Sequence, residues 1–194
     1  LASVLLAGCA TAPLATAPAL PAATAATPLA QSVPSDLPRT ARPTHYTISI
    51  KPDAQTLTFS GNSTVDLVVF EDSPSLVLHA LELNITKAQL VSLDAAGGTQ
   101  VLQVATDNDA QTAIFTAGQP IRAGRYRLET AYTGTINTQA MGLFALNYPD
   151  KITGADRRAL FTQFEAPDAR RFAPMFDEPS YKATFDLTAV VPEG

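Results

Sequence analysis

Apolar and polar residues alternate with a period of two along most of this chain, and that pattern limits the fold more than any other feature. Tyr46, Ile48 and Ile50 would lie on one side of a strand, with Thr47 and Ser49 on the other. The same alternation recurs at residues 65–69, 76–81 and 125–132. A period of two is that of a β-strand with one buried face. At 76–81 both sides carry apolar residues, so we expect both faces to be covered there.

Turn-forming residues separate these runs. They lie at residues 51–53, 60–62, 72–74, 96–98, 107–109, 118–120 and 123–124. Strands that recur at intervals of roughly ten residues are typical of an antiparallel β-sandwich or saddle. We therefore predict an all-β domain over residues 37–194. A single helical turn is expected at 167–171, since Pro167 suits an early helical position and Pro174 limits its length.

The first 36 residues differ in composition from the rest. Residues 10–30 are all Ala, Thr, Pro or Leu, and the first charged residue is Asp36. Repeated Pro prevents a continuous helix, and small side chains bury too little apolar area to offset the entropy lost on ordering. We therefore predict that residues 10–36 form a disordered linker.

The segment before this linker, residues 1–9, reads Leu-Ala-Ser-Val-Leu-Leu-Ala-Gly-Cys. It resembles the end of a bacterial lipoprotein signal peptide, which is cleaved before its Cys. The resemblance implies that Cys9 is lipidated, that the protein is anchored to a membrane, and that it resides in the bacterial cell envelope, on the periplasmic side or at the outer membrane. The alternative is a buried Cys on an apolar segment.

Charge and cysteine content exclude several other classes. The net charge is −5, and no basic stripe of the kind that binds nucleic acid is present, so we expect no nucleic-acid partner. A single Cys cannot form a disulfide within the chain or a Cys-rich metal site. No apolar run reaches the roughly 20 residues that cross a bilayer as a helix. Pattern and composition alone thus indicate a tethered, mostly-β domain, and such domains are commonly binding modules.

The densest motifs lie near the end of the sequence. They are Thr-Gln-Phe-Glu (162–165), Asp-Ala-Arg-Arg (168–171), Phe-Asp-Glu-Pro (176–179) and Lys-Ala-Thr-Phe (182–185). With Pro-Thr-His-Tyr (43–46), Phe-Ser-Gly (59–61) and Gly-Leu-Phe (142–144) upstream, they resemble the N-terminal domain of the aminopeptidase N family of zinc metallopeptidases. The resemblance covers residues 37–194. It implies an enzyme that removes N-terminal residues from peptides, with zinc as its cofactor.

Two residues acquire roles from this resemblance. Glu165 matches the family's Glu that holds the free α-ammonium of the substrate, by a charge-assisted hydrogen bond. Gln163 matches the Gln that lines the pocket for the first side chain and contacts the substrate backbone. If both residues were on one strand, they would share a face. The alternatives are a surface Glu and a Gln that only shapes the sheet.

Other polar residues are predicted to be structural. Asp168, Arg170, Arg171 and Asp177 are expected to form ion pairs that fix their loop, and Glu178 is expected to be extended because it precedes a proline. His45 and His79 have no partner at metal-ligand spacing, so packing roles are expected. Met175 replaces the family's usual Cys, and we expect an effect on packing only.

The 194 residues contain neither the His-Glu-x-x-His zinc motif nor a Gly-x-Met-Glu-Asn segment. The resemblance implies that a C-terminal catalytic domain carries the zinc, that substrate binds between the two domains, and that this part alone is inactive. The alternative is a non-catalytic tethered β-sandwich binding module or a pseudoenzyme. The preferred N-terminal residue and the oligomeric state do not follow from the sequence.

Overall fold

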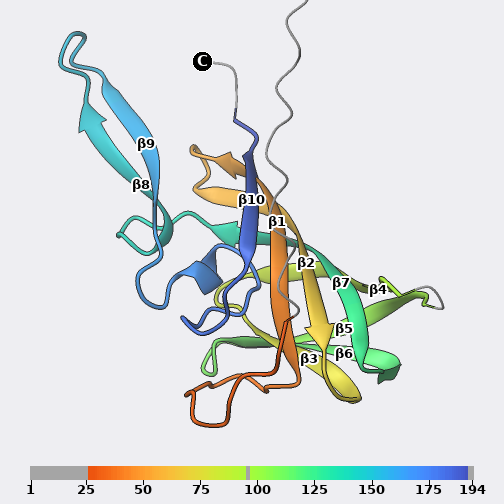
Figure 1. The fold of residues 1–194 in the computed structure, drawn as a ribbon. Helices are drawn as coiled ribbons and strands as arrows, with labels where there is room; N and C mark the ends of the chain where they lie inside the picture. The colour runs from red at the N-terminus through yellow and green to blue at the C-terminus, as the bar shows by residue number, and fades with distance from the viewer. Residues whose placement is uncertain (1–25, 95–96, 192–194) are drawn as a thin grey trace, which may run out of the picture.

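The computed structural model describes residues 26–94 and 97–191, and these residues form ten strands and one short 3-10 helix (Figure 1). The elements, in chain order, are β1 (Ala41–Asp53), β2 (Thr58–Val69), β3 (Ser73–His79), β4 (Asn84–Ser92), β5 (Thr99–Asp107), β6 (Thr112–Ile121), β7 (Gly124–Thr135), β8 (Gly142–Pro149), β9 (Asp156–Gln163), η1 (Ala169–Arg171) and β10 (Thr184–Ala189). The predicted all-β fold is confirmed, and η1 lies within the segment expected to form one helical turn.

Eight strands form one sheet in the order β10-β1-β2-β7-β4-β5-β6-β3, and the sheet curls on itself (Figure 1). Neighbouring strands are antiparallel except β1 and β10, which pair in parallel with Tyr46 opposite Phe185. The alternation pattern gave no indication of this parallel pair. Strands β8 and β9 form a separate hairpin that projects from the sheet.

The core lies on the inner face of the curl, where the alternation predicted it. Tyr46, Ile48 and Ile50 of β1 are buried, and the intervening residues are partly or fully exposed. Leu128 of β7 is completely buried. Each such aliphatic side chain contributes about 1.5–3 kcal/mol relative to exposure. In β3 both faces are covered, as expected, because His79 is buried beside Leu78.

Three predicted turns are wrong, because residues 51–53 are the last three of β1, residues 60–62 lie inside β2 and residues 118–120 lie inside β6. Gly61 pairs directly with Tyr132 of β7. A Cβ on Gly61 would lie 2.5 Å from the Tyr132 ring. This glycine therefore makes room for an aromatic ring in the middle of a strand. In the sequence, a glycine with this role cannot be told from a turn residue.

The prediction of a disordered linker over residues 10–36 is wrong for its last part, residues 26–36. Residues 26–36 contact the domain, and Leu29 is buried in the core. The backbone N–H groups of Asp36 and Leu37 donate to Glu178 Oε1 at 2.8 and 3.2 Å. Buried apolar area and these hydrogen bonds together order a segment whose composition predicts none. Cys9 lies outside the described residues. No helix in the described part of the chain has the length and hydropathy of a membrane span.

The β8–β9 hairpin is buried at its base, and farther out Arg158 of β9 donates to the Ala54 carbonyl in the β1–β2 connection. Residues 142–145 of β8 are buried, whereas residues 146–149 are exposed. The base of β8 also contacts η1, and Phe144 packs against Phe161 of β9 with ring centroids 5.8 Å apart. The base of the hairpin is thus fixed on the body while its tip extends outward (Figure 1).

Candidate functional site

Gln163 and Glu165 lie together at the base of the projecting hairpin. Gln163 is the last residue of β9, and Glu165 lies in the turn that follows it. The two residues therefore do not lie on one strand, since β9 ends at Gln163. They are nevertheless joined, because the Glu165 backbone N–H donates to Gln163 Oε1 at 3.2 Å.

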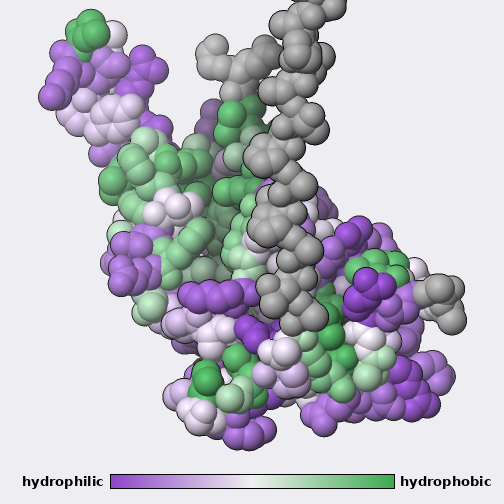
Figure 2. All heavy atoms as spheres, in the orientation of Figure 1, coloured by the Kyte–Doolittle hydropathy of each residue, from purple (hydrophilic) through white to green (hydrophobic). Residues whose placement is uncertain are grey.

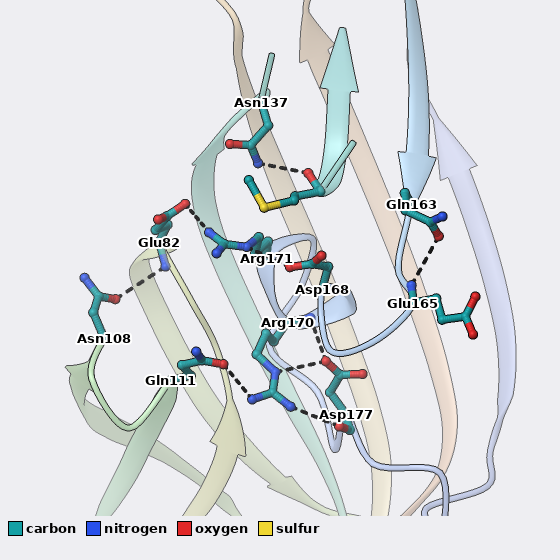
Figure 3. A network of polar contacts seen from close by, with 11 residues as sticks. Glu82, Asn108, Gln111, Asn137, Gln163, Glu165, Asp168, Arg170, Arg171 and Asp177 are labelled. Carbon is teal, nitrogen blue, oxygen red and sulfur yellow. Dashed lines mark hydrogen bonds and ion pairs between the residues drawn. The ribbon is translucent and has the colours of Figure 1, made fainter. Parts of the chain in front are cut away.

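Both side chains are exposed. The Glu165 carboxylate points away from Arg170, Arg171 and their partners (Figure 3). A carboxylate that is not committed to a neighbouring cation can accept hydrogen bonds from an incoming ammonium group. The Gln163 amide, whose oxygen is engaged with the backbone, keeps its two N–H donors.

An aromatic contact holds the backbone between these two residues. Phe164 packs against Phe172 with ring centroids 5.1 Å apart, and Phe172 stacks on Phe59 of β2. The Asp168 backbone N–H donates to the Phe164 carbonyl at 3.1 Å and closes the turn around Glu165. The exposed pair thus lies on a backbone anchored to the core.

Behind this turn lies a network of ion pairs, as predicted (Figure 3). Arg170 is buried, its Nε lies 3.0 Å from Asp177 Oδ2, and its Nη1 donates to Gln111 Oε1 at 2.9 Å. Arg171 Nε donates to Asp168 Oδ1 at 3.0 Å, and its Nη1 pairs with Glu82. Burial lowers the pKa of Arg171, but the hydrogen bonds with Glu82 and Asp168 outweigh burial and raise it, so its charge is fixed.

His79 is buried, in line with the packing role expected for it, whereas His45 is partly exposed. His79 Nδ1 accepts a hydrogen bond from the Asp177 backbone N–H at 3.3 Å. Burial, followed by the positive charge of Arg170, lowers the pKa of His79, so its neutral form is favoured. His45 hydrogen-bonds Thr184 on β10 through Nδ1. Within residues 26–94 and 97–191, no three His, Cys, Asp or Glu residues gather as metal ligands would.

An apolar hollow of about 310 Å³ lies between the turn and strand β10. Its lining residues are Ile48, Phe164, Ala169, Phe172, Met175, Phe185, Asp186 and Leu187. Met175 is buried here and fills space, as predicted. Phe185 and Leu187 are 56% and 62% exposed. Apolar side chains gather at the hairpin base and alongside β10 (Figure 2), and a contiguous apolar surface of this kind marks an interaction site.

Sequence reasoning missed three contributors to this region. Glu178 was expected to be extended, and its role in binding the backbone of residues 36 and 37 had no signal in the sequence. Glu82 was not singled out, although its φ of 57° places it in a conformation uncommon for a non-glycine residue. Gly142 has a φ of 63°, and the only feature of the sequence that drew attention to this residue was the Gly-Leu-Phe motif.

Comparisons with known proteins show the family to which the chain belongs. The family model described as Peptidase M1 N-terminal domain matches residues 42–194, and the chain belongs to this family. Aminopeptidase M1-B of Oryza sativa subsp. japonica is 36% identical over 156 residues, which are 80% of this chain and 17% of the rice protein. Alanine/arginine aminopeptidase of Saccharomyces cerevisiae is 34% identical over 158 residues, which are 79% of this chain and 18% of the yeast protein.

A bacterial relative is also similar. Aminopeptidase N of Acetobacter pasteurianus is 32% identical over 163 residues, which are 84% of this chain and 44% of that protein. The chain thus spans less than a fifth of the rice and yeast relatives and under half of this bacterial one. The family predicted from the motifs at residues 161–185 is confirmed, and the match lies in its N-terminal domain.

Proposed function

We propose that this chain is the N-terminal domain of a zinc-dependent aminopeptidase that removes N-terminal residues from peptides. Its part is to recognise the free α-ammonium and the first residue of the peptide. The observation that carries the proposal is the exposed Glu165 carboxylate, placed beside Gln163 by a 3.2 Å hydrogen bond on a backbone anchored in the core. Membership of the M1 N-terminal domain family supports it.

In this proposal Glu165 accepts a charge-assisted hydrogen bond from the substrate ammonium, and the Gln163 amide donates to the substrate backbone. Such a hydrogen bond gains strength when water is excluded, because the effective dielectric constant falls. On an exposed surface the same contact contributes little. Recognition of the substrate ammonium therefore requires a second domain that covers Glu165 and excludes water.

A C-terminal catalytic domain of the full-length protein is the proposed second domain. The exposed side chains of Phe185 and Leu187 line an apolar hollow together with Phe164, the residue between Gln163 and Glu165, and this surface is suited to packing against another domain. Peptide substrate would then bind between the two domains. Zinc, which would activate water for hydrolysis, has no ligand set among the described residues and belongs to that domain.

The Glu165→Gln substitution in the full-length enzyme tests the proposal, since it removes the charge and keeps the shape. A hydrogen bond to a charged group is worth about 1.5–3 kcal/mol, so kcat/KM for aminoacyl substrates should fall roughly 10- to 150-fold. Glu71→Gln is the matched control, because Glu71 is exposed on the loop before β3, and it should leave kcat/KM unchanged. Unchanged kcat/KM in Glu165→Gln would exclude the role of Glu165.

The coding sequence downstream of Gly194 gives a second, independent test. A catalytic domain requires Gly-x-Met-Glu-Asn followed by His-Glu-x-x-His. A continuing reading frame without these motifs would favour the non-catalytic binding module or pseudoenzyme.

Membrane attachment through Cys9 completes the proposal, with the protein held in the bacterial cell envelope. It is supported by the Leu-Ala-Gly-Cys sequence and the Ala/Thr/Pro-rich stretch that follows. Metabolic labelling with a fatty-acid analogue should mark the wild-type protein and not Cys9→Ser. Equal labelling of both would exclude lipidation at this position.

A further inference from the structure

Arg171 connects the turn that carries Glu165 to the eight-stranded sheet. Its side chain is 17% exposed and donates from Nε to Asp168 Oδ1 at 3.0 Å. Its Nη1 pairs with Glu82 in the connection between β3 and β4. The adjacent carbonyl of Arg170 accepts a hydrogen bond from the Leu81 N–H at 2.9 Å, so backbone and side chain bind the same connection.

Arg171 also supports Gln163 from the opposite strand. Gly142 pairs directly with Gln163 in the β8–β9 hairpin. A Cβ on Gly142 would lie 2.9 Å from the Arg171 Cβ, so the arginine packs closely against the glycine backbone. A displacement of Arg171 would therefore move the backbone of β8 that pairs with Gln163.

The turn around Glu165 depends on Asp168, the other partner of Arg171. The Asp168 N–H closes this turn on the Phe164 carbonyl at 3.1 Å, and its carbonyl accepts the Arg171 N–H at 3.1 Å. The Asp168 carboxylate binds Arg171 Nε. One arginine thus fixes the strand opposite Gln163 and the residue that closes the turn containing Glu165 (Figure 3).

We infer that Arg171 is a positioning residue for the α-ammonium site, acting through Asp168 on Glu165 and through Gly142 on Gln163. The inference rests on the proposed function of Glu165 and Gln163. Arg171 does not touch the substrate. It holds the carboxylate and amide in the relative arrangement that an ammonium and its adjoining backbone require, and small displacements of such groups cost affinity steeply.

The test measures selectivity for the α-ammonium in the full-length enzyme. The inhibition constants of an amino-acid amide and of its des-amino analogue are compared, and their ratio reports the contribution of the ammonium. Arg171→Ala should reduce this ratio roughly tenfold and raise KM more than it lowers kcat. Arg171→Lys should give a smaller loss than Arg171→Ala, because lysine keeps the positive charge. It should still give some loss, because one ammonium group cannot reproduce the arginine fork. A purely structural role would change both inhibition constants equally.

A double-mutant cycle with Glu165→Gln separates positioning from general destabilisation. If Arg171 acts through Glu165, Arg171→Ala should change the ratio less than about twofold in the Glu165→Gln background. Arg122→Ala is the matched control, since Arg122 is 74% exposed and pairs with Asp72 far from the hairpin base, and it should leave the ratio unchanged. Thermal melts of every variant identify loss of fold, and Arg171→Lys remains informative if Arg171→Ala unfolds.

The outcomes distinguish the two proposals. If Glu165→Gln leaves the ratio unchanged, the proposed function fails and the inference fails with it. If Glu165→Gln removes selectivity while both Arg171 variants retain it, only the positioning role is overturned. Full additivity of the two substitutions in the cycle would also overturn it.

Discussion

The guanidinium of Arg170 binds Asp177 at both its side chain and its backbone. Arg170 Nε donates to Asp177 Oδ2 at 3.0 Å, Nη2 donates to the Asp177 carbonyl at 3.2 Å, and the Arg170 N–H donates to Oδ2 at 3.2 Å. The two side chains are only 10% and 16% exposed. These contacts close residues 170–177 into a compact loop behind the turn that bears Glu165.

Removing one member of this pair should strongly destabilise the chain. Asp177→Ala leaves the Arg170 guanidinium buried without its carboxylate, and breaking a buried ion pair costs about 3–5 kcal/mol. Urea denaturation measures the loss. Asp72→Ala, which breaks the exposed pair with Arg122, should cost under about 1 kcal/mol. Equal losses in the two variants would contradict the importance of burial.

Gly142→Ala should destabilise the base of the hairpin. Its φ of 63° is unfavourable for residues with a Cβ, and the new Cβ would lie 2.9 Å from the Arg171 Cβ. Strain of this kind costs about 1–3 kcal/mol. Gly118→Ala is the matched control, because no atom lies within 4 Å of a Cβ there and its φ is ordinary, so its stability should be unchanged or higher. A lower melting temperature for Gly118→Ala than for Gly142→Ala in thermal denaturation would refute this account.

Glu178→Ala should release the segment before β1. The carboxylate accepts the backbone N–H groups of Asp36 and Leu37, and its loss leaves the Asp36 N–H without this partner and the Leu37 N–H with Ser35 Oγ at 3.2 Å. Amide hydrogen exchange at these two residues should accelerate, while exchange at Leu128 in β7 stays slow. Unchanged exchange at Asp36 and Leu37 would show that Glu178 does not hold this segment.

The buried His79 should make stability depend on pH. Its pKa in the folded state is lowered by burial and by Arg170 from an ordinary 6.5, so the unfolded chain binds the proton at a higher pH. Stability is then fully present above about 6.5 and falls as pH decreases toward the lowered folded pKa. His79→Asn keeps an acceptor for the Asp177 N–H and does not titrate there. The free energy of unfolding, measured by urea denaturation at several pH values, should change less with pH in the variant than in the wild type. The same pH dependence in both proteins would contradict the assignment.

Part of the site followed from local sequence alone. The alternation at residues 46–50 identified the buried face of β1 correctly, because a period of two decides which side of a strand a residue faces. The motif Thr-Gln-Phe-Glu singled out Gln163 and Glu165, and Asp168, Arg170, Arg171 and Asp177 formed ion pairs as expected, since opposite charges close in sequence meet readily across a tight loop.

Other features were decided only by the tertiary structure. Alternation does not specify which strand lies beside β1, so its parallel partner β10 was not predicted. Residues 60–62 combine Ser, Gly and Asn as turns do, yet the Tyr132 ring on the neighbouring strand requires Gly61 inside β2.

The sequence by itself thus determined the all-β class, the buried faces of the strands and the two residues proposed to meet the substrate. The tertiary structure decided how those residues are held: Glu82 reaches Arg171, and Glu178 reaches residues 36 and 37, across long stretches of chain. The physical reason is that periodicity records the local exposure of each side chain. Contacts between distant residues arise only when the whole sheet curls and brings its connections together.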